Sequence, residues 1–237
     1  MISFFVALAA LASSASAKEI KFKALSLSQP EIEIGFKNSK GKIDVFTVYA
    51  HALSSEKTVT TKERKIVLLT AERNSSGKIN WATYATADVP PDLDSVILIL
   101  SGDASHPKAT IVSDPPEKSQ GGSLRFLNTC PYSVGINLPG FKKILASGTE
   151  TFCKPSLSHE TYGQGQLFTS NDSSGWRPAG GMRWLQLNDV RTLWFIAPDP
   201  NNFNLVTVHG IEESARSTLV SPALKINPKN AVSQTDR

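Results

Sequence analysis

Hydrophobic and polar residues alternate with a period of two along most of this chain, in short runs rich in β-branched side chains. Such runs are typical of half-buried β-strands. After Ala17 no stretch keeps a 3.6-residue apolar period for three turns, so the pattern predicts no helix. The strands it predicts are 20–27, 32–36, 43–50, 65–70, 79–85, 95–100 and 109–112 in the first half, and 124–128, 134–138, 149–153, 164–169, 182–187, 192–196 and 205–209 in the second. Clusters of Gly, Pro, Asn and Ser separate them, which predicts an all-β fold of Ig-like β-sandwiches.

The two halves of the chain resemble each other. In each half a strand ends, a proline (Pro30 or Pro131) turns the chain, and a β-branched strand follows. In each half an Asn/Ser/Gly turn precedes a tryptophan, Trp81 or Trp176. The repeated order predicts two tandem β-sandwich domains, 18–113 and 123–220. A Pro- and Gly-rich linker with little to bury joins them at 114–122, and a flexible tail follows at 221–237.

Residues 1–17 have the features of an export signal. An apolar run from Ile2 to Ala12 leads into small residues that end at Ala17, and charge begins at Lys18. The run is too short to span a bilayer, and no later segment approaches a membrane span. We therefore expect cleavage near Ala17 and a mature chain in the periplasm or outside the cell. Because the segment before the run has no Lys or Arg, a buried N-terminal helix stays open as an alternative.

The charge balance argues against nucleic acid as a partner. The net charge of +4 falls in the second half, since residues 18–117 hold 13 basic and 13 acidic side chains and residues 118–237 hold 12 and 8. The longest basic run is Lys142–Lys143. A nucleic-acid surface needs a stripe of Lys and Arg with interleaved aromatic residues, which this chain lacks.

Cys130 and Cys153 are the two cysteines of the chain. In an oxidising compartment an isolated pair predicts a disulfide, worth about 3 kcal/mol for a loop of this size. Two unrelated buried thiols are the alternative. Without a neighbouring histidine pair, the cysteines do not make a zinc site.

The sequence contains no catalytic signature and implies no cofactor. None of its histidines (His51, His106, His159 and His209) has a partner at a metal-binding spacing, and no Gly-x-Ser-x-Gly elbow is present. His159 and Glu160 form the one suggestive pair, but the second histidine of a zinc peptidase is missing. A non-enzymatic protein is therefore expected, with a hydrolase built around His159 as the less favoured alternative.

Aromatic residues near arginines are the remaining lead. Four candidate surface aromatics lie in the second half near Arg177, Arg183 and Arg191: Tyr162, Trp176, Trp184 and Trp194. Alternation puts Trp184 opposite Leu185, which predicts an exposed Trp184, whereas Trp194 lies in an apolar run and is expected in the core. Trp176, Trp184, Arg177 and Arg183 are therefore the candidate ligand-binding residues, and exposed aromatic rings beside arginine would suit a glycan.

The segment Ser123–Leu138 resembles repeats of uncharacterised secreted β-sandwich proteins of Gram-negative bacteria, in which a V-R-F-x-N-x-S/T-P strand and turn opens the domain. Residues 183–200 are similar to the closing strands of those repeats, and the cysteine pair is a departure from them. The resemblance implies fold and export but no reaction. Together these observations predict an exported protein-interaction or cell-envelope module, with a carbohydrate-binding module as the alternative.

Overall fold

The computed structural model describes residues 17–103, 105–115, 120–170, 175–199, 201–202 and 204–215. The described residues form sixteen β-strands and no helix, which confirms the all-β prediction. The strands are β1 (Lys18–Ser26), β2 (Glu31–Lys37), β3 (Ile43–Tyr49), β4 (Lys57–Thr61), β5 (Lys65–Arg73), β6 (Ile79–Asp88), β7 (Ser95–Ser101), β8 (Lys108–Ser113), β9 (Leu124–Asn128), β10 (Val134–Leu138), β11 (Phe141–Leu145), β12 (Glu150–Cys153), β13 (Thr161–Thr169), β14 (Arg177–Gln186), β15 (Val190–Pro198) and β16 (Val206–Ser214). The expected tail, and all of the expected leader except Ala17, lie outside the described residues. Within the described part of the chain, no helix could cross a membrane.

The strands form four sheets of four, and the second pair of sheets repeats the first. The first half builds sheets β4-β1-β7-β8 and β3-β2-β5-β6, and the second half builds β12-β9-β15-β16 and β11-β10-β13-β14. In both halves the first strand pairs in parallel with the seventh, and a β-bulge interrupts the pairing of the fifth and sixth. The repeated topology is the structural counterpart of the repeat seen in the sequence.

Each half encloses its own apolar core. In the first, the rings of Phe22, Phe36 and Phe46 pack edge to face with centroids 5.2 to 6.0 Å apart. In the second, the core gathers apolar side chains from both sheets around Phe126 and Leu167. Both halves are therefore two-layer sandwiches that bury the inward side of each strand.

Alternation located fourteen of the strands and missed two, β4 and β11. Both are short edge strands whose sequences, Lys-Thr-Val-Thr-Thr and Phe-Lys-Lys-Ile-Leu, are rich in polar and cationic residues. Lysine on an edge strand prevents pairing with another chain, and it also weakens the apolar pattern that marks a strand.

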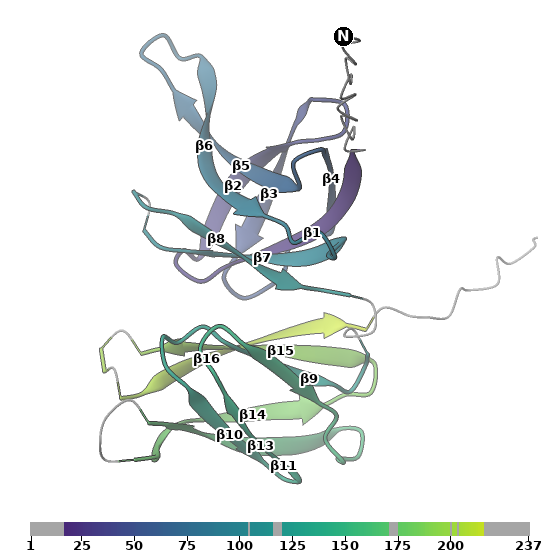
Figure 1. Ribbon diagram of the computed structural model, residues 1–237, viewed down its shortest axis with the longest axis vertical. Helices are drawn as coiled ribbons and strands as arrows, with labels where there is room; N and C mark the ends of the chain where they lie inside the picture. Colours follow the sequence, from purple (N-terminus) through teal and green to yellow (C-terminus); the bar gives the residue numbers. More distant parts are fainter. Residues whose placement is uncertain are drawn as a thin grey trace, which may run out of the picture.

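The two sandwiches pack against each other through sheets β4-β1-β7-β8 and β12-β9-β15-β16 (Figure 1). A third apolar cluster lies between them, with Leu25, Ile97 and Ile99 from one side and Leu127, Leu193, Phe195 and Ile211 from the other. The molecule is therefore a stack of four sheets, in which β3-β2-β5-β6 and β11-β10-β13-β14 are the outer layers.

A balanced group of six charged residues completes this interface; we call it the interface ion cluster: Lys23, Asp114, Arg125, Glu150, Arg191 and Glu213. Arg191 donates two hydrogen bonds to Asp114, Nη1 to Oδ1 at 2.7 Å and Nη2 to Oδ2 at 3.2 Å. Its Nε also donates to Glu213 at 2.8 Å. Burial disfavours the Arg191 charge, but the hydrogen bonds and charges of Asp114 and Glu213 outweigh burial and raise the pKa of Arg191.

The interface ion cluster corrects the expectation of a linker with little to bury. Asp114, the first linker residue, is fully buried. At the far end of the linker, Gly122 donates its amide to the Val190 carbonyl at 2.8 Å and accepts a hydrogen bond from Gln186. Both ends of the linker are thus held by the domains that it joins.

The predicted Cys130–Cys153 disulfide is absent, and both residues are free thiols. The antiparallel pairing of β9 with β12 puts Cys153 opposite Leu124, at the start of β9, while Cys130 follows the end of that strand. At roughly 3.3 Å per residue this offset exceeds the ~7 Å Cα separation that a disulfide can bridge. Burial raises the pKa of each thiol to about 11.

Candidate functional site

The outer layer β11-β10-β13-β14 presents one face away from the core, which we call the C-terminal outer face. Side chains alternate between the two sides of a strand, and Leu167 of β13 points into the core. The even-numbered residues of β13 therefore point to the C-terminal outer face: Tyr162, Gln164, Gln166 and Phe168. Glycine occupies two positions of this face, Gly135 opposite Phe168 and Gly181 opposite Gln166, so part of the face is bare backbone.

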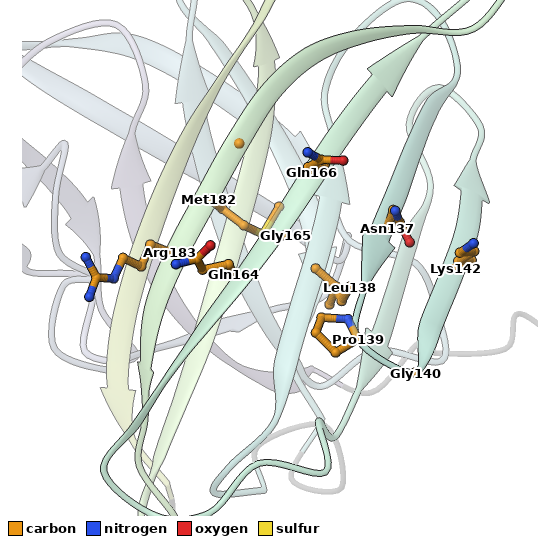
Figure 2. A pocket seen from close by; sticks show the side chains of 11 residues that line it. Asn137, Leu138, Pro139, Gly140, Lys142, Gln164, Gly165, Gln166, Met182 and Arg183 are labelled. Carbon is orange, nitrogen blue, oxygen red and sulfur yellow. The ribbon is translucent and has the colours of Figure 1, made fainter.

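Strand register brings polar side chains together in the middle of the C-terminal outer face. Asn137 on β10 pairs with Lys142 on β11 and with Gln166 on β13. Two residues along β13, Gln164 pairs with Arg183 on β14. Figure 2 shows these five side chains on four adjacent strands. Since neighbouring strands lie about 4.8 Å apart, the side chains can contact one small polar molecule or an extended polymer.

These residues line a shallow open cleft of about 890 Å³, together with Pro139, Gly140, Gly165 and Gly181. Gly181 pairs with Gln166, and a methyl group added to it would meet nothing closer than the Gly165 carbonyl oxygen at 3.5 Å. The missing side chain leaves the cleft open between the amides of β13 and the edge of β14. Amide groups both donate and accept hydrogen bonds, so the cleft matches a ligand that does the same.

Tyr162 lies at one end of the cleft and is 58% exposed. The guanidinium carbon of Arg183 stands over its ring, 4.2 Å from the centroid. This cation–π contact holds the arginine in place on the sheet surface. Arg183 and Tyr162 therefore form one fixed unit beside Gln164.

Trp176 lies at the other end, just before β14, and is 44% exposed. Its six-membered ring packs over Gly135. A Cβ atom at that position would lie 3.3 Å from the ring, which is tighter than an ordinary van der Waals contact. Phe168 pairs with Gly135 on one side and Ile144 pairs with it on the other. The result is an apolar groove beside the polar cleft, lined also by Asn137 and Lys142.

Trp184 is buried, with 4% of its surface exposed, so the prediction of an exposed Trp184 was wrong. The period-two alternation holds in this part of β14, but the side that carries Met182, Trp184 and Gln186 is the one that faces the core. Trp184 packs where Gly163 has no side chain, since a Cβ there would lie 2.2 Å from the indole ring. Its Nε1 donates to Gln186 Oε1 at 3.1 Å, so a polar residue shares the inward side. Trp194 is buried as expected.

The four candidate residues therefore separate into three environments. Trp176 and Arg183 lie on the C-terminal outer face, Trp184 lies in the core, and Arg177 is half-buried with Nη2 3.5 Å from Asn204 Oδ1. The residues that sequence reasoning missed are the amides Asn137, Gln164 and Gln166 and the cation Lys142. Gln-Gly-Gln in a strand pattern was the available signal, because its glutamines share one face.

His159, the residue of the hydrolase alternative, lies at the surface. His159 Nε2 lies 3.6 Å from the carboxylate of its sequence neighbour Glu160, and both side chains are exposed. His159 Nδ1 accepts a hydrogen bond from the backbone of Asn188 at 3.2 Å. Across the described ranges, no three His, Cys, Asp or Glu side chains gather as a metal site.

Comparison with known proteins adds little. No protein-family model and no curated protein sequence matches this chain. Among solved structures, human GIVD cytosolic phospholipase A2 matches with a TM-score of 0.26 and 11% identity over 86% of this chain and 33% of its own. The shaft pilin SpaA from Lactobacillus rhamnosus GG matches with a TM-score of 0.18 and 8% identity over 78% of this chain and 99% of its own. The chain spans about a third of the phospholipase, and similarities this low carry no argument about function.

Proposed function

We propose that this protein is a non-enzymatic binding protein whose C-terminal outer face binds carbohydrate. The observation that carries the proposal is the set of side chains crossing four adjacent strands: three amides (Asn137, Gln164 and Gln166) between two cations (Lys142 and Arg183). Sugar hydroxyls donate and accept hydrogen bonds, and amide side chains can meet both needs.

The aromatic ends of the face support the same ligand class. Tyr162 and Phe168 point outward from the same strand, six residues apart, and Trp176 flanks Phe168. At about 3.3 Å per residue the aromatic ends are about 20 Å apart, enough for a short oligosaccharide. Aromatic rings offer flat apolar surfaces on which the C–H faces of sugar rings can stack.

A glycan array probed with the full chain tests the proposal. Binding should fall when Gln166→Ala or Trp176→Ala removes a group from the face. Trp81→Ala is the matched control, since Trp81 packs over Gly35 of the N-terminal domain as Trp176 packs over Gly135. The melting temperature of each variant, compared with that of the wild type, shows whether weaker glycan binding comes from the missing side chain or from a loss of folded protein. Absence of glycan binding by the wild-type chain would end the proposal.

A protein partner is the second candidate function. One large apolar side chain on an edge strand favours it: Phe152 on β12 is 58% exposed. The proposal predicts that Phe152→Ser abolishes capture of a specific partner, while Phe168→Ser on the C-terminal outer face leaves capture unchanged. Equal capture by the wild type and Phe152→Ser would exclude an interface at β12.

Export belongs to the same proposal. It rests on the apolar run and small residues before Lys18 and on the resemblance of residues 123–210 to secreted tandem sandwiches. Mass spectrometry of the mature chain from its source should find an N-terminus at Lys18. An intact Met1 on the accumulated protein would contradict export by cleavage.

A further inference from the structure

The two outer layers of the molecule share one topology but differ in charge. Strands β2, β3, β5 and β6 carry five carboxylates and three cations: Glu31, Glu33, Asp44, Glu72, Asp88, Lys37, Lys65 and Arg73. The equivalent strands β10, β11, β13 and β14 carry four cations and no carboxylate: Lys142, Lys143, Arg177 and Arg183. Since both layers fold with the same strand order, the fold does not require this charge.

Two of these four cations, Lys142 and Arg183, flank the amides on the C-terminal outer face. The other two, Lys143 and Arg177, pair with the inward-facing residues Ile136 and Thr169. Lys142 lies on edge strand β11 beside Asn137, and Arg183 lies on edge strand β14 beside Gln164 (Figure 2). A ligand in the cleft is thus within about one or two strand spacings of a positive charge wherever it lies.

Both cations are available to a ligand. In the described part of the chain, neither Lys142 nor Arg183 forms an ion pair. The guanidinium carbon of Arg183 lies over the Tyr162 ring, 4.2 Å from its centroid, and this contact holds the arginine on the sheet surface. A guanidinium group has five N–H donors in a planar fork, which suits bidentate hydrogen bonds to a carboxylate or a sulfate.

From this charge complementarity we infer that the ligand of the C-terminal outer face is an acidic carbohydrate, a chain of sugars that bear carboxylate or sulfate groups. The inference rests on the proposed carbohydrate function and adds the charge of the ligand. The amides receive sugar hydroxyls, and Lys142 and Arg183 receive the acidic groups. The three amides that separate the two cations distinguish this face from the continuous basic stripe of a nucleic-acid surface.

The test is a glycan array in which each acidic glycan is paired with its carboxyl-reduced or desulfated counterpart. The full chain should bind acidic members about tenfold more tightly than their neutral counterparts. Raising NaCl from about 0.05 to about 0.5 M should weaken the acidic interactions, because salt screens exposed charges. Arg183→Gln and Lys142→Gln should each weaken acidic binding by about tenfold, and should weaken neutral binding much less, so that the preference for acidic over neutral members falls.

Lys37→Gln is the matched control, because Lys37 is an exposed cation on the outer layer of the N-terminal domain. It should bind every glycan as the wild type does. Equal binding of acidic glycans and their neutral counterparts would overturn the inference and leave the proposed function standing. Binding of polyuridylate as tight as that of acidic glycans would overturn it as well. No binding to any glycan would overturn both.

Discussion

Removal of the Asp114 charge tests whether the interface ion cluster holds the two domains together. Asp114 is fully buried and receives two hydrogen bonds from Arg191. Arg125 and Lys23 lie 3.7 and 3.9 Å from its carboxylate oxygens. Asp114→Asn keeps the shape of the side chain but leaves three cations facing two carboxylates.

The expected loss of stability is large for a single substitution. Removing one partner of a buried ion pair costs about 3–5 kcal/mol, because the other charge stays buried without compensation. With a denaturation slope of about 2–3 kcal/mol/M, a loss of that size lowers the urea midpoint by about 1–2.5 M. Because Asp114 joins the domains, unfolding should also separate into two transitions when tryptophan fluorescence and circular dichroism are compared.

Asp94→Asn is the control, since Asp94 also faces two cations, Lys18 at 2.7 Å and Arg64 at 3.7 Å, but is exposed. It should shift the midpoint little. Adding Arg191→Gln to Asp114→Asn restores the charge balance, so the double variant should lose less than the sum of the single losses. Equal midpoints for Asp114→Asn and Asp94→Asn, or strict additivity with Arg191→Gln, would refute a stabilising role for the interface ion cluster.

Three further predictions concern the thiols and the glycines. In the absence of reductant, two thiols of the unfolded chain should react with Ellman's reagent, whereas Cys130 and Cys153 should react slowly in the native chain. If the thiols of the unfolded chain react only after a reductant is added, the cysteines are not free. The thiols ionise near pH 11 in the native chain and near pH 9 in the unfolded chain, so ionisation does not change the free energy of unfolding below about pH 9. As the pH rises from 9 toward 11, the free energy of unfolding falls by up to about 1.4 kcal/mol per pH unit for each thiol. In urea titrations, replacing both cysteines by serine should flatten this decline. Gly163→Ala should cost about 1–3 kcal/mol because its Cβ would clash with Trp184, whereas Gly181→Ala should cost much less; equal costs would contradict the packing of Trp184.

The sequence was sufficient to predict where most strands lie, but not which side of each strand is buried. In β14, alternation grouped Met182, Trp184 and Gln186 correctly. Leucine at 185 and glutamine at 186 made the opposite face look like the core. The glutamine is buried because it bonds to Trp184 and to the Gly122 carbonyl, and Gly122 is far away in sequence. When a polar residue is buried by a hydrogen bond to a residue distant in sequence, the alternation pattern predicts the wrong side of the strand as the buried one.

The sequence contained a weak signal of the interface ion cluster. Arg125 and Arg191 each stand second in a strand that is otherwise mostly apolar, Leu-Arg-Phe-Leu-Asn and Val-Arg-Thr-Leu-Trp-Phe-Ile. A cation inside an apolar run predicts a buried partner, because a buried charge is tolerated only when it is paired. The partner, Asp114, belongs to the linker, so no spacing along the chain points to it.

The sequence by itself determined that this protein is a tandem all-β chain, because period-two alternation and turn residues act locally and recur in both halves. Tertiary structure decided the rest. Strand register kept Cys130 from Cys153, placed Trp184 inside, and gathered Lys142, Asn137, Gln166, Gln164 and Arg183 on one open face. Register is set by contacts between strands that are distant in sequence, and it is register that turns scattered amides and cations into a surface able to bind.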